Sequence, residues 1–284
     1  MQNKIQDCCT KPYQLAPQGF FNTVRVALKR YGFTGSLARY LMMQDEFRKF
    51  VKSVDFDNEK AFRKDLLRKF NLIQKKVPCL HSPYQFVLIA TFILKLTIEG
   101  PIVQCGCFKG GSTAKLSLLA ERTKRLLYVC DSFKGLPAPR DDKESFLEGH
   151  NDSPNLALSV GEYEGTLKEV KENIKRYGCI EVCEFIPGLF SESLIALDVN
   201  PSFVFIDVDF ASSARDCLKY LWPRLVPGGY WFTHEAGFPQ YIYSILDPEW
   251  WHNALRECPP VIMGGGSGLS SISEYLAYFK KVPK

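Results

Sequence analysis

With 284 residues, 46% of them hydrophobic and 24% charged, the chain has the composition of a soluble globular protein. The most apolar segment, residues 86–98, is too short to cross a bilayer and contains Lys95, so we expect no membrane-spanning helix and no membrane partner. The first twenty residues are polar and lack a secretory signal, and no pair of cysteines has CxxC spacing. We therefore expect a cytoplasmic protein whose ten cysteines are reduced thiols.

The net charge of +5 is concentrated at the front of the chain. Residues 1–80 hold 16 Lys and Arg against 7 Asp and Glu, and the remainder is slightly acidic. A basic segment suits nucleic acid or an acidic partner, but here the charges alternate in sign, as on a solvated helical face. We favour the solvated face and expect no nucleic-acid partner.

Residues 1–80 read as helices without a functional motif. Apolar residues recur at helical spacing over 19–31, from Ser36 to Val51 and from Asp57 to Phe70, with Ser36 and Asp57 suited to cap their helices. Amphipathic helices of this kind must cover another surface. The segment is predicted to be an N-terminal helical cap or lid, which also offers a surface for a homodimer. A fourth helix is expected to begin at Ser82-Pro83.

From Pro101 onward, the sequence pattern predicts alternating strands and helices. Strands are predicted over 102–105, 126–130, 181–186, 203–206 and 230–233, and helices over 113–120 with Ser112 as cap, 166–177, 212–221 and near 250–257. Residues 132–161 form a long loop. Two last strands, near 261–263 and 275–279, are joined by too short a link for a parallel crossover. The pattern predicts an α/β domain over 81–284, with a mostly parallel sheet, helices on both faces and a C-terminal antiparallel hairpin.

Polar residues follow four of these strands, where an open α/β sheet binds its ligands. They are Gln104 with Gly106, Asp131, Asp207 with Asp209, and His234-Glu235. Asp131 lies about 20 residues after the glycine turn, where a carboxylate accepts the ribose hydroxyls of an adenosine.

The glycine turn itself argues against a dinucleotide. A GxGxxG pattern needs glycine at position 108, which is Phe108, and no GxxxxGK[ST] triphosphate motif is present. This weakens the alternative of a nicotinamide-dependent oxidoreductase. An adenosyl ligand without phosphates, S-adenosyl-L-methionine, fits the turn better.

Five motifs in order resemble the macrocin O-methyltransferase family over roughly residues 80–235. They are Cys-Gly-Cys-Phe-Lys-Gly-Gly-Ser at 105–112, Asp-Ser-Phe-Lys-Gly-Leu-Pro at 131–137, Ile-Pro-Gly-Leu-Phe-Ser at 186–191, Phe-Ile-Asp-Val-Asp at 205–209 and Pro-x-Leu-x-Pro-Gly-Gly-Tyr at 223–230. The resemblance implies a Rossmann-like class I methyltransferase fold with a seven-stranded sheet. Members typically methylate sugar hydroxyls of secondary metabolites, so a small hydroxylated acceptor is implied.

The resemblance also implies roles for single residues. Asp207 would lie at the methyl-transfer centre, and relatives commonly bind magnesium with such an Asp and two acidic residues after the fifth strand. The cofactor would be held by the glycine turn, the ribose carboxylate and the residues after the third strand, namely Gln104, Gly106, Gly110, Asp131, Ser132, Phe133, Gly188, Leu189 and Phe190.

Two departures from the family pattern leave alternatives open. Gln104 stands where a Glu is usual, and His234-Glu235 stands where two acids are usual. Asp207, His234 and Glu235 would still bind a divalent ion, with His favouring Mn, Fe or Zn. Alternatively, His234 is a metal-free general base, or a strand-end residue without a catalytic part. A protein that binds S-adenosylmethionine with lost or altered catalysis, and an RNA methyltransferase, are the remaining alternatives.

Overall fold

The computed structural model describes residues 35–53, 60–148, 155–264 and 275–283. Its main sheet has seven strands in the order β5-β2-β1-β6-β7-β9-β8. The first five of these pair in parallel, whereas β9 pairs antiparallel with both β7 and β8. This confirms the predicted mostly parallel sheet with its C-terminal antiparallel hairpin. The strands are β1 (Ile102–Cys105), β2 (Leu127–Asp131), β5 (Cys183–Pro187), β6 (Phe203–Ile206), β7 (Tyr230–Thr233), β8 (Met263–Gly264) and β9 (Ala277–Lys280).

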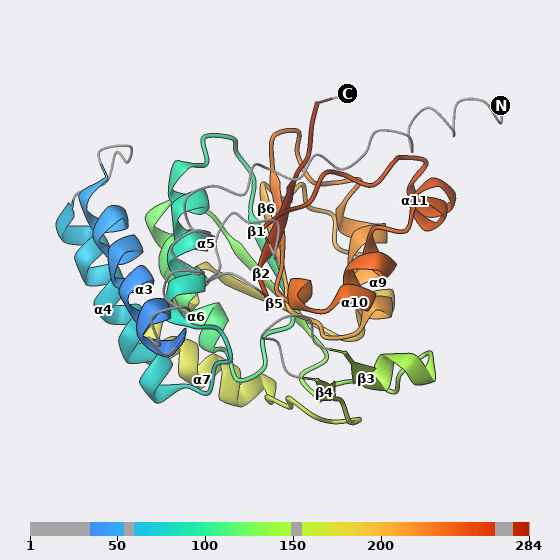
Figure 1. Cartoon of the computed structure of the whole chain (residues 1–284), viewed down its shortest axis with the longest axis horizontal. Coiled ribbons are helices and arrows are strands. Elements are labelled where there is room, and N and C mark those ends of the chain that lie inside the picture. The colour runs from blue at the N-terminus through green and yellow to red at the C-terminus, as the bar shows by residue number, and fades with distance from the viewer. Residues whose placement is uncertain (1–34, 54–59, 149–154, 265–274, 284) are drawn as a thin grey trace.

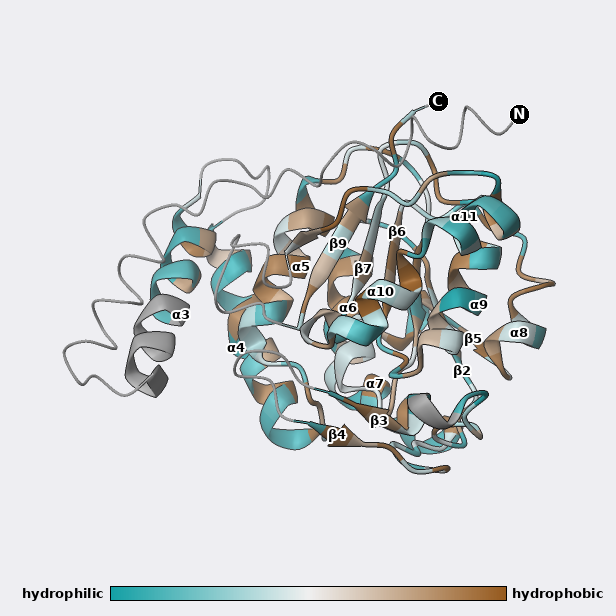
Figure 2. Ribbon diagram, turned by 45° about the vertical axis from the view of Figure 1, so that its right-hand side comes forward, coloured by the Kyte–Doolittle hydropathy of each residue, from teal (hydrophilic) through white to brown (hydrophobic). Residues whose placement is uncertain are grey.

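The central strands β1 and β6 are buried along their whole length. Each is almost entirely apolar, which is typical of parallel strands covered on both faces. Successive side chains enter opposite cores: Ile102 belongs to one hydrophobic cluster and Val103 to the other. Figure 2 shows the hydrophobic strands between helices whose outer faces are more hydrophilic.

Helices cover both faces of the sheet (Figure 1). One layer contains α3 (Gly35–Lys52), α4 (Lys60–Lys76), α5 (Pro83–Lys95), α6 (Gly111–Arg122) and α7 (Leu167–Tyr177). The other contains α8 (Phe190–Ser193), α9 (Ala211–Leu221), α10 (Pro239–Ile245) and α11 (Pro248–Leu255). The two layers bury separate hydrophobic clusters against the sheet.

The described part of the N-terminal segment packs on the α/β part of the chain. Leu66 and Phe70 of α4 are buried in the same cluster as Ile102 of β1. The predicted helix over 19–31 and the Asp57 cap lie outside the described residues, and the division at residue 80 stays a prediction. The predicted start of α5 is confirmed, because Ser82 caps the helix in a capping box with Gln85.

Several local features differ from the sequence prediction, including the unpredicted helices α8 and α10. Helix α6 begins at Gly111 and is preceded by Gly110 with a left-handed φ of 85°, so Ser112 lies inside the first turn and is not the cap. The long loop contains a short antiparallel hairpin, β3 (Phe146–Leu147) with β4 (Leu156–Ala157), and a 3₁₀ turn, η1 (Asp142–Ser145). Strands of two residues leave too little periodicity to be recognised.

Among the described helices, none combines the length and the apolar character that a bilayer crossing requires. Seven cysteines of the described residues are free thiols.

Candidate active site

A cavity of about 280 Å³ lies at the carboxyl ends of the parallel strands. Its walls come from the turn after β1, the loop after β2, the segment after β5 and the loop after β6. The lining includes residues 78–81, 106–108, 131–132, 135–138, 188–191 and 207–209. This is the position at which an open α/β sheet holds its ligand, and of the predicted polar strand ends it collects Gly106, Asp131, Asp207 and Asp209.

The turn after β1 requires a glycine at position 106. Gly106 has a φ of +83°, and a Cβ at this position would lie 1.8 Å from the backbone oxygen of Asp207. The N–H of Asp207 in turn donates to the oxygen of Cys105 at 2.9 Å. The ends of β1 and β6 are therefore in direct backbone contact, which brings Asp207 beside the glycine turn.

Asp131 holds the glycine turn in place from the end of β2. One carboxylate oxygen accepts the N–H of Cys107 and the other accepts the N–H of Phe133, both at 2.7 Å. Burial raises the pKa of Asp131, although these backbone N–H groups oppose the shift. Each oxygen keeps a second lone pair, so the carboxylate can still accept a ligand hydroxyl.

Backbone strain is concentrated around the cavity. Phe108, Phe133, Tyr163 and Asp209 all have φ between 48° and 58°, in the left-handed region that non-glycine residues rarely adopt. Three of them line the cavity, and Phe133 follows Ser132, which does. Strained residues of this kind accumulate at binding and catalytic sites.

The predicted cofactor residues divide into two groups. Six line the cavity: Gly106, Asp131, Ser132, Gly188, Leu189 and Phe190. Gln104, Gly110 and Phe133 are not part of its lining. Gln104 is fully buried, and its Nε2 donates to the oxygen of Gly106 at 2.9 Å and to Oγ of Ser112 at 2.7 Å. Gln104 therefore stabilises the glycine turn through these two hydrogen bonds.

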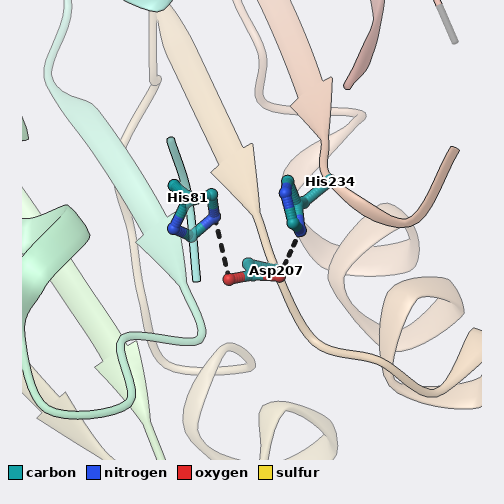
Figure 3. Close-up of side chains that lie close together, drawn as sticks. All are labelled: His81, Asp207 and His234. Carbon is teal, nitrogen blue, oxygen red and sulfur yellow. Dashed lines mark ion pairs between the residues drawn. The ribbon is translucent and has the colours of Figure 1, made fainter. Parts of the chain in front are cut away.

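Three side chains meet where β6 and β7 end and where the chain enters α5 (Figure 3). His81 Nε2 lies 3.0 Å from Oδ2 of Asp207, and His234 Nδ1 lies 3.2 Å from Oδ1 of the same carboxylate. The two imidazole rings are 4.3 Å apart between centroids. Asp207 and His81 line the cavity, whereas His234 does not.

The two histidines control the charge of Asp207. Burial opposes its ionisation, but attraction by His81 and His234 outweighs burial and holds the pKa of Asp207 well below its usual range. Burial also lowers the pKa of His81, yet Asp207 overrides it and raises that pKa to about 10. The pKa of His234 is lowered by burial and by the neighbouring His81.

The outer nitrogens of both rings have partners. Nδ1 of His81 lies 3.6 Å from Sγ of Cys79, and Nε2 of His234 lies 3.1 Å from Nε2 of Gln85. Oε1 of Gln85 accepts the N–H of Ser82 at 2.8 Å. The capping box of α5 thus orients the Gln85 amide, which donates to His234 in this arrangement.

Glu235 does not join this cluster, which differs from the predicted set of Asp207, His234 and Glu235. Its Oε1 accepts the N–H groups of Val208 at 2.7 Å and Asp209 at 3.1 Å, and its Oε2 accepts from Thr233 at 3.0 Å. The carboxylate is directed to the backbone after β6. Among the residues that the structure describes, the three side chains whose ligand atoms lie within reach of one another are His81, Asp207 and His234.

His81 is the residue that sequence reasoning missed. It lies 126 positions before Asp207, outside the five family-like motifs, and nothing in the spacing relates it to the strand ends. Only the packing of α5 against the sheet brings it to the cavity: its ring contacts Phe86 of α5 and Phe205 of β6 at centroid distances of 5.4 and 5.3 Å.

Comparison with known proteins identifies the family. The model of the macrocin O-methyltransferases matches residues 85–244, which is more than half of the chain. The chain belongs to this family. The macrocin O-methyltransferase match begins after His81, so this residue lies outside the matched region.

Two curated relatives are O-methyltransferases by name. The chain is 32% identical over 143 residues to an 8-demethyl-8-(2,3-dimethoxy-alpha-L-rhamnosyl)-tetracenomycin-C 4'-O-methyltransferase of Streptomyces olivaceus, covering 47% of this chain and 51% of the relative. It is 29% identical over 152 residues to a mycinamicin III 3''-O-methyltransferase of Micromonospora griseorubida, covering 50% and 57%. The matches thus span about half the length of these two relatives.

Solved structures confirm the class I methyltransferase fold. The O-methyltransferase NovP superposes with a TM-score of 0.53 at 17% identity, covering 88% of this chain and all of that one. The calicheamicin methyltransferase CalS11 gives 0.50 at 13% identity, covering 79% and 95%. At these identities the likeness establishes the fold of this macrocin-family chain.

Proposed function

We propose that the protein is an S-adenosylmethionine-dependent O-methyltransferase acting on a hydroxyl of a sugar or secondary-metabolite acceptor. Membership of the macrocin O-methyltransferase family carries the proposal. The cavity supports it, because the family's glycine turn, ribose carboxylate and post-β5 segment meet there with Asp207. The curated relatives suggest the acceptor class, since one is named for a rhamnosyl-bearing tetracenomycin and the other for mycinamicin III.

The chain's own residues suit the adenosyl cofactor. Gly106 offers a backbone without a side chain, Asp131 offers free lone pairs, and Leu189 and Phe190 offer an apolar wall. Gln104 contributes through its hydrogen bonds to the turn. When bound, S-adenosylmethionine supplies an electrophilic methyl group, and the protein's task is to align the acceptor oxygen with it.

Asp207 is the proposed catalytic group. It lines the cavity and is held ionised by two histidines, so it can accept a hydrogen bond from an acceptor hydroxyl and orient its lone pair. His234 is proposed to act through Asp207. Direct proton transfer to His234 would require its Nε2, which already faces the Gln85 amide, or its Nδ1, which faces Asp207.

Binding and turnover separate this function from its alternatives. We expect S-adenosylhomocysteine to bind in calorimetric titration and NAD not to bind, whereas tight NAD binding would support the oxidoreductase. Radiolabelled methyl transfer to deoxysugar-bearing acceptors should occur with the native protein. It should be lost in Asp207→Ala and Asp207→Asn while S-adenosylhomocysteine affinity stays within a few-fold. Full activity in both variants would refute the role of Asp207.

A binding protein without catalysis is the second candidate. The buried Gln104, which offers no carboxylate to the cavity, favours it. It predicts S-adenosylhomocysteine binding with no transfer to any acceptor. We further propose a cytoplasmic location and a homodimer through the N-terminal helices, which sedimentation of the full chain would test.

A further inference from the structure

We propose that His81, Asp207 and His234 form a divalent transition-metal site with nitrogen-rich ligation, in which His81 supplies the third ligand in place of Glu235. The ligands are Nε2 of His81, the Asp207 carboxylate and Nδ1 of His234. The site is part of the proposed methyltransferase centre, but metal binding is measured without methyl transfer, so either proposal can fail alone.

The first observation is the unsatisfied nitrogen of His81. The side chain is 3% exposed, and its Nε2 has no hydrogen-bond partner although Oδ2 of Asp207 lies 3.0 Å away. The other ring nitrogen faces the sulfur of Cys79, an acceptor for its hydrogen. Without a metal, a proton on Nε2 bridges this nitrogen and the carboxylate oxygen in the ion pair described above, and a divalent cation would take the place of that proton.

The second observation is convergence. One ligand atom from each of the three side chains lies within 4.8 Å of the other two. Each comes from a different element: the entry to α5, the end of β6 and the end of β7. Buried packing fixes His81, and the contact of β1 with β6 fixes Asp207, so the donor atoms are held in place before an ion binds.

The donor set selects the metal. Magnesium prefers oxygen ligands in an octahedral arrangement and keeps several waters. Two imidazoles and one carboxylate instead suit Fe²⁺, Mn²⁺, Co²⁺ or Zn²⁺. Glu235, which would have added an oxygen ligand, is committed to the backbone of Val208 and Asp209. These residues therefore do not fit the magnesium centre that the family pattern implies.

Gln85 modulates the site from the outer side of His234. A metal on Nδ1 places the ring hydrogen on Nε2, which then needs an acceptor. The Gln85 amide presents its nitrogen there, because its oxygen accepts from Ser82. Metal binding must therefore turn this amide and weaken the capping box. A glutamate at position 85 would accept from both groups at once.

The test uses the untagged full chain, stripped with chelator and titrated with Co²⁺ at pH 8 while visible absorption is recorded. We expect one Co²⁺ per chain with ligand-field bands, displacement by Zn²⁺, and no displacement by a 100-fold excess of Mg²⁺. His81→Ala and His81→Gln should bind Co²⁺ at least 10-fold more weakly, whereas His252→Ala, which changes an exposed histidine on α11, should match the native protein. Gln85→Glu should bind several-fold more tightly.

The proposal is overturned if the native chain binds no stoichiometric Co²⁺, if Mg²⁺ displaces it at comparable concentration, or if both His81 variants bind like the native protein. Unchanged affinity in Gln85→Glu would overturn Nδ1 of His234 as a ligand atom. Circular dichroism and S-adenosylhomocysteine titration of each variant show that the fold is intact, so weak binding in a folded His81 variant reports the ligand itself.

Discussion

The carboxylate of Glu235 accepts the backbone N–H of Val208 at 2.7 Å, which ties the end of β7 to the loop that follows Asp207. The same oxygen accepts the N–H of Asp209, whose φ of 55° is strained. Glu235→Ala removes this acceptor and leaves the buried N–H of Val208 without a partner. We expect a loss of about 2–4 kcal/mol of unfolding free energy, measured by urea denaturation.

Glu235→Gln is the matched control. Its amide oxygen can still accept both backbone N–H groups, so we expect less than half of the loss seen in the alanine variant. If Glu235→Ala and Glu235→Gln lower the unfolding free energy equally, the negative charge of Glu235 and not its hydrogen-bond acceptor would hold the loop. The positional role assigned to Glu235 would then be wrong.

Gly106 and Gly161 share a left-handed φ, +83° and +81°, but differ in the space around them. A Cβ at Gly106 would collide with the backbone oxygen of Asp207, whereas a Cβ at Gly161 would have no heavy atom within 4 Å. Gly161→Ala should therefore cost about 1 kcal/mol, the conformational penalty alone. Gly106→Ala must also push β1 from β6, and it should lower the thermal midpoint far more and abolish S-adenosylhomocysteine binding. Similar midpoints for the two variants would contradict the close approach.

Asp131 has a structural and a proposed binding role, which one substitution can separate. In Asp131→Asn a single oxygen remains to accept from Cys107 or Phe133, and one ribose hydroxyl loses its anionic partner. We expect S-adenosylhomocysteine affinity to fall roughly 10- to 100-fold, as for loss of one or two charge-assisted hydrogen bonds. Calorimetric titration measures this, with Glu172→Gln on the exposed face of α7 as control. Unchanged affinity would place the ribose elsewhere.

The fold was predictable because its signals are local. The apolar residues at 203–206 and 230–233 match β6 and β7 at both ends, and the Ser82 cap matches the start of α5. Proline, glycine and short apolar runs give such boundaries directly. The short hairpin of β3 and β4 gave no such signal, because each strand has only two residues and lies within a polar loop.

The site was predictable only where its residues follow strands. Asp131 and Asp207 lie at strand ends, and parallel pairing brings all strand ends to one edge. Glu235 also follows a strand, but its orientation depends on which backbone groups lack acceptors, which sequence spacing does not contain. His81 required the packing of α5 on the sheet, a tertiary contact with no local pattern. Gln104 was expected at the ligand, yet burial directs its amide to the glycine turn.

The carboxylate of Glu144 connects the loop after β2 to the start of α9 through hydrogen bonds. One oxygen accepts the N–H of Ser212 at 2.7 Å and the other accepts its hydroxyl at 2.9 Å, while Arg140 of the same loop pairs with Asp216 of α9. Arg140, Ser212 and Asp216 also line the cavity. Glu144→Ala removes an N-terminal helix acceptor worth about 1 kcal/mol and loosens this wall.

We therefore expect faster hydrogen exchange of residues 136–147 in Glu144→Ala and a 3- to 10-fold weaker S-adenosylhomocysteine affinity, with global stability reduced by only about 1 kcal/mol. Glu144→Gln retains an acceptor for Ser212 and should exchange at close to the native rate. If hydrogen exchange in Glu144→Ala instead increases throughout α9 and the sheet, Glu144 stabilises the whole fold. Its contact with Ser212 would then not be a local stabilisation of the cavity wall.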